Sequence, residues 1–178
     1  PTINPLVEET KVISFNLGNA NTYNTWPISA PIPSATPADL LNCIIAPWQD
    51  VDPGVGGQTN YYTVGLSPNR KFVVSFVSLP MFQCNNLFST SQIVLNETSN
   101  VIDVYIQDKP ICSTWNSGAA IEGIQDQTGS NAEVVPGRNY PTNWTAVNDG
   151  YRFMPSGAPN YTIQWLDPSN TVIANTAA

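Results

Sequence analysis

Histidine is missing from this 178-residue sequence. Its absence removes the commonest general base and the commonest metal ligand in proteins. Ser-His-Asp catalysis, Cys-His catalysis and His-ligated zinc sites are therefore excluded, and three cysteines are too few for an all-cysteine zinc site. Catalysis by carboxylates alone, as in glycosidases, is not excluded by this absence.

Charge is scarce as well. Charged residues make up 11% of the chain, against about 25% in an average soluble domain. The six Lys and Arg residues are scattered, so no basic cluster is available to displace counterions from phosphates. With 13 acidic residues, the net charge is −7. We therefore expect no nucleic-acid partner and no electrostatic attachment to anionic lipid.

Long apolar runs and helix-forming segments are also absent. No run approaches the roughly 18–20 residues of a membrane span, so we expect no direct membrane insertion. Residues 1–4 lack the charged and apolar regions of a signal peptide, which predicts a trimmed precursor or an excerpt of a longer chain. Because 16 prolines and 11 glycines interrupt the sequence, the only helical feature expected is a single turn, or else a capped loop, at 37–41.

Strand patterns recur along the chain instead. Residues 71–79 carry apolar side chains on both alternating faces, which is typical of a strand with two partly buried faces. Residues 100–107 alternate cleanly between two faces. Further strands are predicted at 11–17, 42–47, 61–66, 90–96, 119–124, 143–148, 151–154 and 161–166. About ten short strands of this kind predict an all-β fold, an antiparallel β-sandwich.

The composition changes near residue 155. Small residues and prolines over 155–159 are typical of a linker, and two strands are predicted to flank a turn at 166–170. A two-stranded unit is marginally stable by itself. We therefore expect a β-sandwich over 1–155 and, over 156–178, a linker with the first strands of a following domain, or a strand donated elsewhere.

Several strings of residues resemble nidogen-like extracellular domains. They are IAPWQDVD at 45–52, followed by Gly56-Gly57 and Tyr61-Tyr62, and the strands at 72–76, 91–95 and 120–125. A closer likeness, over 11–155, is to a domain of very large secreted adhesins and gliding-motility proteins of Bacteroidota. The resemblance implies a jelly-roll or nidogen-like sandwich that lacks its first strands, followed at 161–165 by the start of an immunoglobulin-like domain. It also implies type IX secretion to the cell surface.

Two cysteines are placed to bridge a hairpin. Cys84 and Cys112 flank the strands predicted at 90–96 and 100–107, and pairing of these strands would bring the two ends together. A disulfide there closes a loop of about 28 residues, worth roughly 3–4 kcal/mol in the chain-entropy model. Cys43 lies in an apolar run and is predicted to be a small buried side chain. The alternative is three reduced thiols in a cytosolic protein, which the Asn-, Thr- and Pro-rich composition disfavours.

Asp50 and Asp52 are the best candidates for metal ligands. Alternate carboxylates at a tight turn resemble the first half of a calcium loop, and strand periodicity places both on one side. The second half of such a loop is missing, because its twelfth position is Tyr61. The alternative is that the two carboxylates accept backbone hydrogen bonds and hold the turn. No cofactor other than calcium is expected.

Trp115, Asn116 and Trp144 form a candidate ligand-binding set. Exposed Trp beside Asn can stack on sugar rings, whereas the alternative places both indoles over the sandwich core. Glu122 and Asp126 could form a glycosidase pair, but solvated surface carboxylates are far commoner. We therefore expect no enzymatic activity.

The expected function is that of an extracellular or cell-surface module, part of a large adhesin or surface-filament protein that mediates adhesion or assembly. Its expected partners are other domains of the same chain, neighbouring subunits and surface glycans. The alternative is a carbohydrate- or calcium-dependent recognition domain attached to a secreted enzyme. The two differ in whether Asp50 and Asp52 bind an ion, and in whether Trp115 and Trp144 face solvent together.

Overall fold

The computed structural model describes residues 6–8, 10–19, 27–156, 162–166 and 171–177. The strands are β1 (Leu6–Glu8), β2 (Val12–Ser14), β3 (Cys43–Trp48), β4 (Gln58–Val64), β5 (Lys71–Met81), β6 (Cys84–Asn96), β7 (Ile102–Lys109), β8 (Ile121–Gln125), β9 (Ala132–Val134), β10 (Ala146–Phe153), β11 (Thr162–Leu166) and β12 (Val172–Ala177). Short 3₁₀ turns lie at Leu17–Asn19, Ala38–Leu40 and Asn116–Gly118. None of the described helices is long and apolar enough to cross a membrane.

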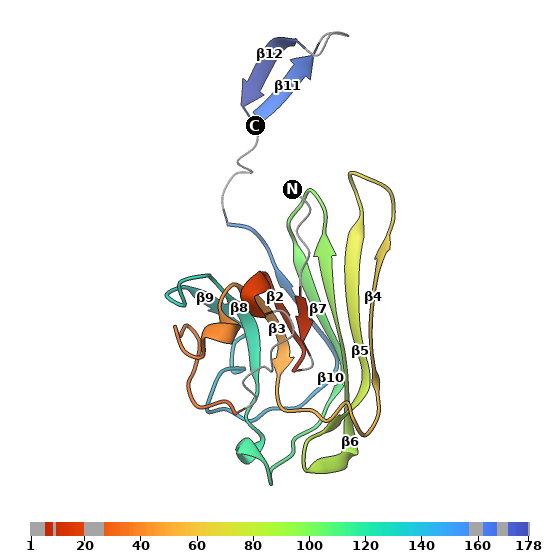
Figure 1. The fold of residues 1–178 in the computed structure, drawn as a ribbon, viewed down its shortest axis with the longest axis vertical. Coiled ribbons are helices and arrows are strands. Elements are labelled where there is room, and N and C mark those ends of the chain that lie inside the picture. Colours follow the sequence, from red (N-terminus) through yellow and green to blue (C-terminus); the bar gives the residue numbers. More distant parts are fainter. Residues whose placement is uncertain (1–5, 9, 20–26, 157–161, 167–170, 178) are drawn as a thin grey trace.

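Two antiparallel sheets of five strands each pack against one another (Figure 1). One has the order β1-β2-β3-β8-β9, with short strands. The other has the order β10-β7-β6-β5-β4, with longer strands. We call them the short-stranded and the long-stranded sheet. The predicted all-β antiparallel sandwich is confirmed.

The main core fills the space between the sheets, and strand alternation builds it. The long-stranded sheet contributes Val74, Phe76, Ile93, Val104 and Ile106. The short-stranded sheet contributes Ile13, Ile44, Ala46 and Ala120 with its neighbouring loop. Burial of these side chains, at about 25 cal/mol per Å² of apolar surface, is the main force that holds the sheets together.

A second cluster covers the outer face of the short-stranded sheet. Ile28, Ile32 and Leu40, from the segment before β3, pack there with Val12, Ile45 and Trp48. Strand β3 is therefore buried on both faces, which explains its almost uninterrupted apolar sequence.

The structure corrects some predicted strand boundaries. The strands predicted at 143–148 and 151–154 are one strand, β10, because the chain continues past Asn148 in the same register instead of turning. Asn148 has a φ of 49° and does not pair with β7, but Val147 and Asp149 pair with Asp108 and Ile106 in an unchanged register. The strand predicted at 11–17 is shorter than expected, since only Val12–Ser14 pairs before the first 3₁₀ turn. The predicted turn at 37–41 is a single 3₁₀ turn.

Strands β11 and β12 form a separate two-stranded antiparallel sheet. Their pairing runs from Thr162 opposite Ala177 to Leu166 opposite Val172. The linker at 157–161 and the turn at 167–170 lie outside the described residues. The assignment of this hairpin to an immunoglobulin-like domain stays a prediction.

Candidate functional site

The predicted disulfide joins the ends of the β6–β7 hairpin. Cys84 opens β6 and Cys112 follows β7, and their Cα atoms lie 5.8 Å apart across the S–S bond. The prediction of this disulfide is confirmed. Cys43 is buried, as expected, and its thiol donates a hydrogen bond to the Leu40 carbonyl at 2.8 Å.

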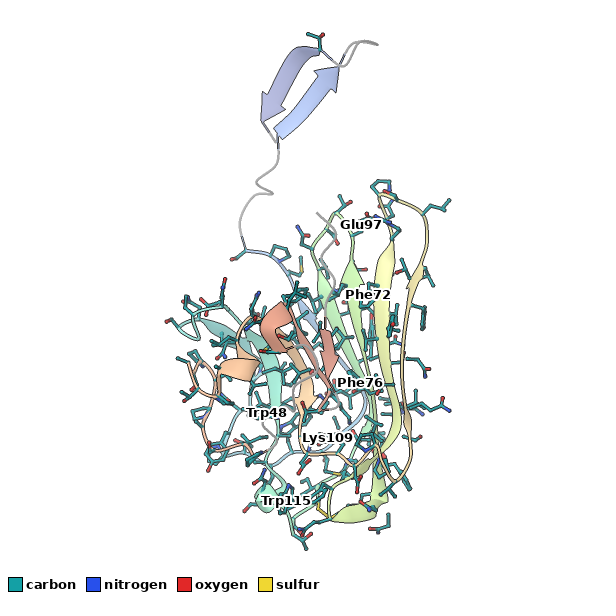
Figure 2. All side chains as sticks on the ribbon, in the orientation of Figure 1. Trp48, Phe72, Phe76, Glu97, Lys109 and Trp115 are labelled. Carbon is teal, nitrogen blue, oxygen red and sulfur yellow. A yellow bond between two sulfur atoms is a disulfide. The ribbon has the colours of Figure 1, made fainter. Side chains whose placement is uncertain are left out.

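The Trp115 indole lies at the same end of the sandwich as the disulfide (Figure 2), and the Asp50 carboxyl lies close to that indole. The backbone after β3 runs beside the end of β5, because Asp52 N donates to Pro80 O at 2.8 Å and Phe82 N donates to Asp50 O at 3.2 Å. The Phe82 ring meets the Trp115 indole edge-on, with 4.9 Å between centroids. We call Asp50, Asp52 and Trp115, with Phe82 and the disulfide, the Asp50–Trp115 site.

The carboxyl of Asp50 has an unusual pKa. Burial raises the pKa from 3.8 to about 6; the Trp115 indole opposes the rise and the Asp52 carboxylate adds to it. The indole Nε1 is buried close to this carboxyl, but it completes no hydrogen bond of good geometry with any described residue. Its influence on Asp50 is therefore that of a nearby N–H dipole. The site combines a carboxyl that titrates near pH 6 with an unused buried donor.

In the described structure, no third acidic, His or Cys side chain joins Asp50 and Asp52 to hold the predicted calcium ion. Among the described residues, no group of three or more His, Cys, Asp or Glu side chains is arranged to hold a metal ion. The turn is held by the backbone, since Val55 N donates to Asp52 O at 3.1 Å. Calcium at this position stays a prediction.

Trp144 is buried in the core and does not share a solvent-facing surface with Trp115. Only 9% of Trp144 is exposed, and its Nε1 donates to Ala120 O at 2.9 Å. Trp115 is half-buried, and Asn116 begins the third 3₁₀ turn beside it. The joint sugar-stacking surface envisaged for these residues is therefore absent from the described structure, because the Trp144 indole is used for packing.

A buried charge cluster surrounds Trp144. The Nζ of Lys109 and the guanidinium carbon of Arg138 each lie 4.5 Å from the centre of the indole ring. Arg138 donates to Glu122 Oε2 at 2.5 Å and also pairs with Asp149. Lys109 Nζ donates to the Trp144 carbonyl at 2.6 Å. The cluster ties β7, β8 and β10 together with the loop that carries Arg138.

Burial dominates the electrostatics of this cluster. It raises the pKa of Glu122 although Arg138 opposes the rise, and it lowers the pKa of Lys109 to about 8. Glu122 Oε1 is buried with no hydrogen-bond partner in the described part of the chain. Asp126, the other half of the envisaged glycosidase pair, accepts hydrogen bonds from Thr128 and Asn131 in its own turn. The two carboxylates thus have separate structural partners.

A family model described as NIDO related matches residues 8–165. The chain belongs to the NIDO-related family. No curated protein and no solved structure matches the chain.

The NIDO-related match supports the nidogen-like resemblance, and domains of this type are typical of extracellular proteins. The disulfide between Cys84 and Cys112 is compatible with this location, because disulfides persist in oxidising compartments. The match begins at the last residue of β1, covers the other strands of both sheets, and ends one residue before the end of β11.

Sequence reasoning missed three members of the NIDO-related domain's charge cluster, Lys109, Arg138 and Asp149. Lys109 lies 35 positions from Trp144, and Arg138 lies 16 from Glu122. No local pattern links residues this far apart. The one available signal was the scarcity of charge, since only six basic residues occur in the chain and two of them face this one indole.

Proposed function

We propose that this NIDO-related domain is a non-enzymatic module of a large cell-surface adhesin or filament protein, in which it mediates adhesion or assembly. The family match over residues 8–165 carries the proposal. The structure supports it in one further way: the cluster around Trp144 uses Glu122, Arg138 and Lys109 in contacts within the fold. These groups contact one another and Trp144 within the sandwich.

The proposal extends to the biological setting. We infer a Bacteroidota surface protein exported by type IX secretion and acting in attachment or gliding motility. Its partners would be other domains of the same chain, neighbouring subunits and surface glycans. The low content of basic residues supports the exclusion of nucleic acid from this set.

An in-frame deletion tests the adhesive role. Cells of the source organism that make the parent protein without residues 8–156 should attach to surfaces, or glide, less well than cells complemented with the intact gene. Immunoblots for the remainder of the protein check that it is still made and exported. Normal attachment and gliding, with the shortened protein at the normal level, would contradict the proposal.

A second candidate function is ligand recognition at the Asp50–Trp115 site. The unused Trp115 Nε1 beside the Asp50 carboxyl favours it, because a bound glycan hydroxyl would satisfy that donor. Calorimetric titration with calcium chloride and with surface polysaccharide, comparing the natural protein with Asp52→Asn and Trp115→Phe, tests it. Asp126→Asn, in a separate turn, is the matched control. Heats unaltered by the two site variants would remove this candidate.

A further inference from the structure

A lysine is buried where the chain enters the edge of the short-stranded sheet. Lys11 directly precedes β2, and 0% of it is exposed. Its Nζ has no hydrogen-bond partner in the described structure. Removing an amine from water without giving it a partner costs free energy, and the cost is far larger when the amine is charged. The closed fold therefore favours the neutral form of Lys11.

The charged groups that act on Lys11 come from β7, in the opposite sheet. Burial lowers the pKa of the Lys11 amine well below its usual range, the Lys109 ammonium lowers it further, and the Asp108 carboxylate opposes the change. β3 and β6 carry no charged residue. On β8, Glu122 is ion-paired with Arg138. The elements packed around Lys11 thus supply no hydrogen-bonded carboxylate that would hold its proton.

The backbone around Lys11 is suited to local opening. Lys11 has a φ of 66°, in the left-handed region that side chains other than glycine seldom adopt. β1 and β2 have three residues each, and β3 is the strand that holds them to the rest of the sheet (Figure 1). We call these two strands and the turn between them the edge hairpin. Short elements at the border of a sheet open at a lower free-energy cost than the whole domain.

We propose that the edge hairpin is a proton-operated release element of this domain. When the Lys11 amine takes up a proton from solvent, the hairpin leaves β3 and carries the resulting ammonium into water. The other strands of both sheets stay paired. Release uncovers the backbone edge of β3, a strand without charged residues. The inference does not depend on the adhesive role of the parent protein.

The direction of the response follows from linkage. Between the ordinary pKa of a lysine, about 10.4, and the lowered pKa in the closed fold, the open state binds one proton more than the closed state. The closed state is therefore most favoured at high pH, and the equilibrium constant for opening rises by about tenfold for each unit by which the pH falls through this range. Lys109, whose pKa burial lowers to about 8, gains its charge in the same range and adds repulsion against Lys11.

Hydrogen exchange followed by mass spectrometry tests the release in the natural protein. Protection of the backbone amides in β2, corrected for the intrinsic exchange rate, should fall at least tenfold between about pH 9 and about pH 6. Protection of the amides of Ile93–Leu95, in the interior of the long-stranded sheet, should fall much less. Unchanged protection in β2, or a parallel loss in β2 and at Ile93–Leu95, would overturn the proposal.

Two substitutions test whether Lys11 is the group that titrates. Lys11→Met removes the amine and keeps much of its apolar stem, so the pH dependence of protection in β2 should disappear. Lys71→Met, at the exposed start of β5, is the matched control and should keep the pH dependence of the natural protein. A pH dependence that persists in Lys11→Met would overturn the proposal. If Lys11→Met does not fold, the comparison of β2 with Ile93–Leu95 in the natural protein still decides.

Discussion

Replacing Arg138 with Met should destabilise the fold, and the loss should depend strongly on pH. Glu122 is completely buried, and Arg138, with 18% of its side chain exposed, is its only ion-pair partner among the described residues. Met keeps much of the apolar stem of Arg but removes the charge. The variant therefore leaves Glu122 as a buried carboxylate without its counter-ion.

The size of the loss follows from what Glu122 can then do. Removing one partner of a buried ion pair typically costs about 3–5 kcal/mol. Glu122 can limit this loss by taking up a proton, because burial already raises its pKa. At pH 7 that protonation, from an unfolded pKa near 4.3, costs about 3.7 kcal/mol, and it becomes about 1.4 kcal/mol easier for each unit by which the pH falls. We expect a loss of about 3–4 kcal/mol at pH 7 and about 1 kcal/mol at pH 5.

The sign agrees with linkage. In the variant the folded pKa of Glu122 lies above the unfolded value, so its contribution is complete below the unfolded pKa and is lost as the pH rises through the folded pKa. Urea unfolding with the disulfide intact, at several pH values between about 5 and 7, measures the effect. At about 2–4 °C per kcal/mol for a chain of this size, the melting temperature at pH 7 should fall by about 6–16 °C.

Two control variants separate this explanation from general damage. Arg70→Met breaks the ion pair with Glu97 on the surface and should change stability little at either pH, because solvent screens an exposed pair. In a Glu122→Gln background the titrating group is absent, so the further loss caused by Arg138→Met, measured against Glu122→Gln alone, should be the same at pH 5 and pH 7. A loss in Arg138→Met that is equal at pH 5 and pH 7 would refute the reasoning.

Three further predictions concern other parts of the sandwich. Reducing the Cys84–Cys112 disulfide, or replacing both residues with Ser, should lower the free energy of unfolding by about 3–4 kcal/mol, because the bond closes a loop of 28 residues. A loss below about 1 kcal/mol, measured by urea unfolding, would count against this stabilisation by loop closure. Asp50→Asn should gain stability relative to the natural protein as the pH rises from about 4 to about 7. The reason is that the stabilisation from the protonated Asp50 carboxyl is complete below its unfolded pKa of 3.8 and is lost as the pH rises through its folded pKa of about 6. Parallel profiles of melting temperature against pH for the two proteins would contradict that folded pKa. Lys11→Met should stabilise the fold by about 1–3 kcal/mol, because the Lys11 amine is buried without a hydrogen-bond partner in the described structure. Lys71→Met, at the exposed start of β5, is the control. Marked destabilisation by Lys11→Met alone would show that the amine has an essential partner.

The sandwich was predictable because its strands carry period-two patterns. In the strand predicted at 71–79, apolar residues on both faces matched an interior strand, and Val73 and Val74 are both buried. The hairpin that follows also allowed the disulfide to be predicted, since its two strands are adjacent in sequence. The boundary error at β10 arose because Asn148 looks like a turn residue, whereas here it lies inside a strand that keeps its register.

The candidate site was less predictable, because it depends on contacts between distant segments. Trp144 lies in a polar stretch of sequence, yet it is buried where Lys109 and Arg138 converge. The pKa of Asp50 likewise depends on its partial burial, which raises it, and on Trp115, 65 positions away in the sequence, which opposes the rise. Neither environment can be inferred from neighbouring residues.

The surface location of the natural protein is the most direct test of the account. Intact cells of the source organism should be treated with protease, and the released peptides analysed by mass spectrometry without reduction. The account predicts peptides of this domain outside the cell, with Cys84 linked to Cys112, from a parent protein much larger than 19.3 kDa. Peptides found only after lysis, with both cysteines reduced, would contradict an extracellular module.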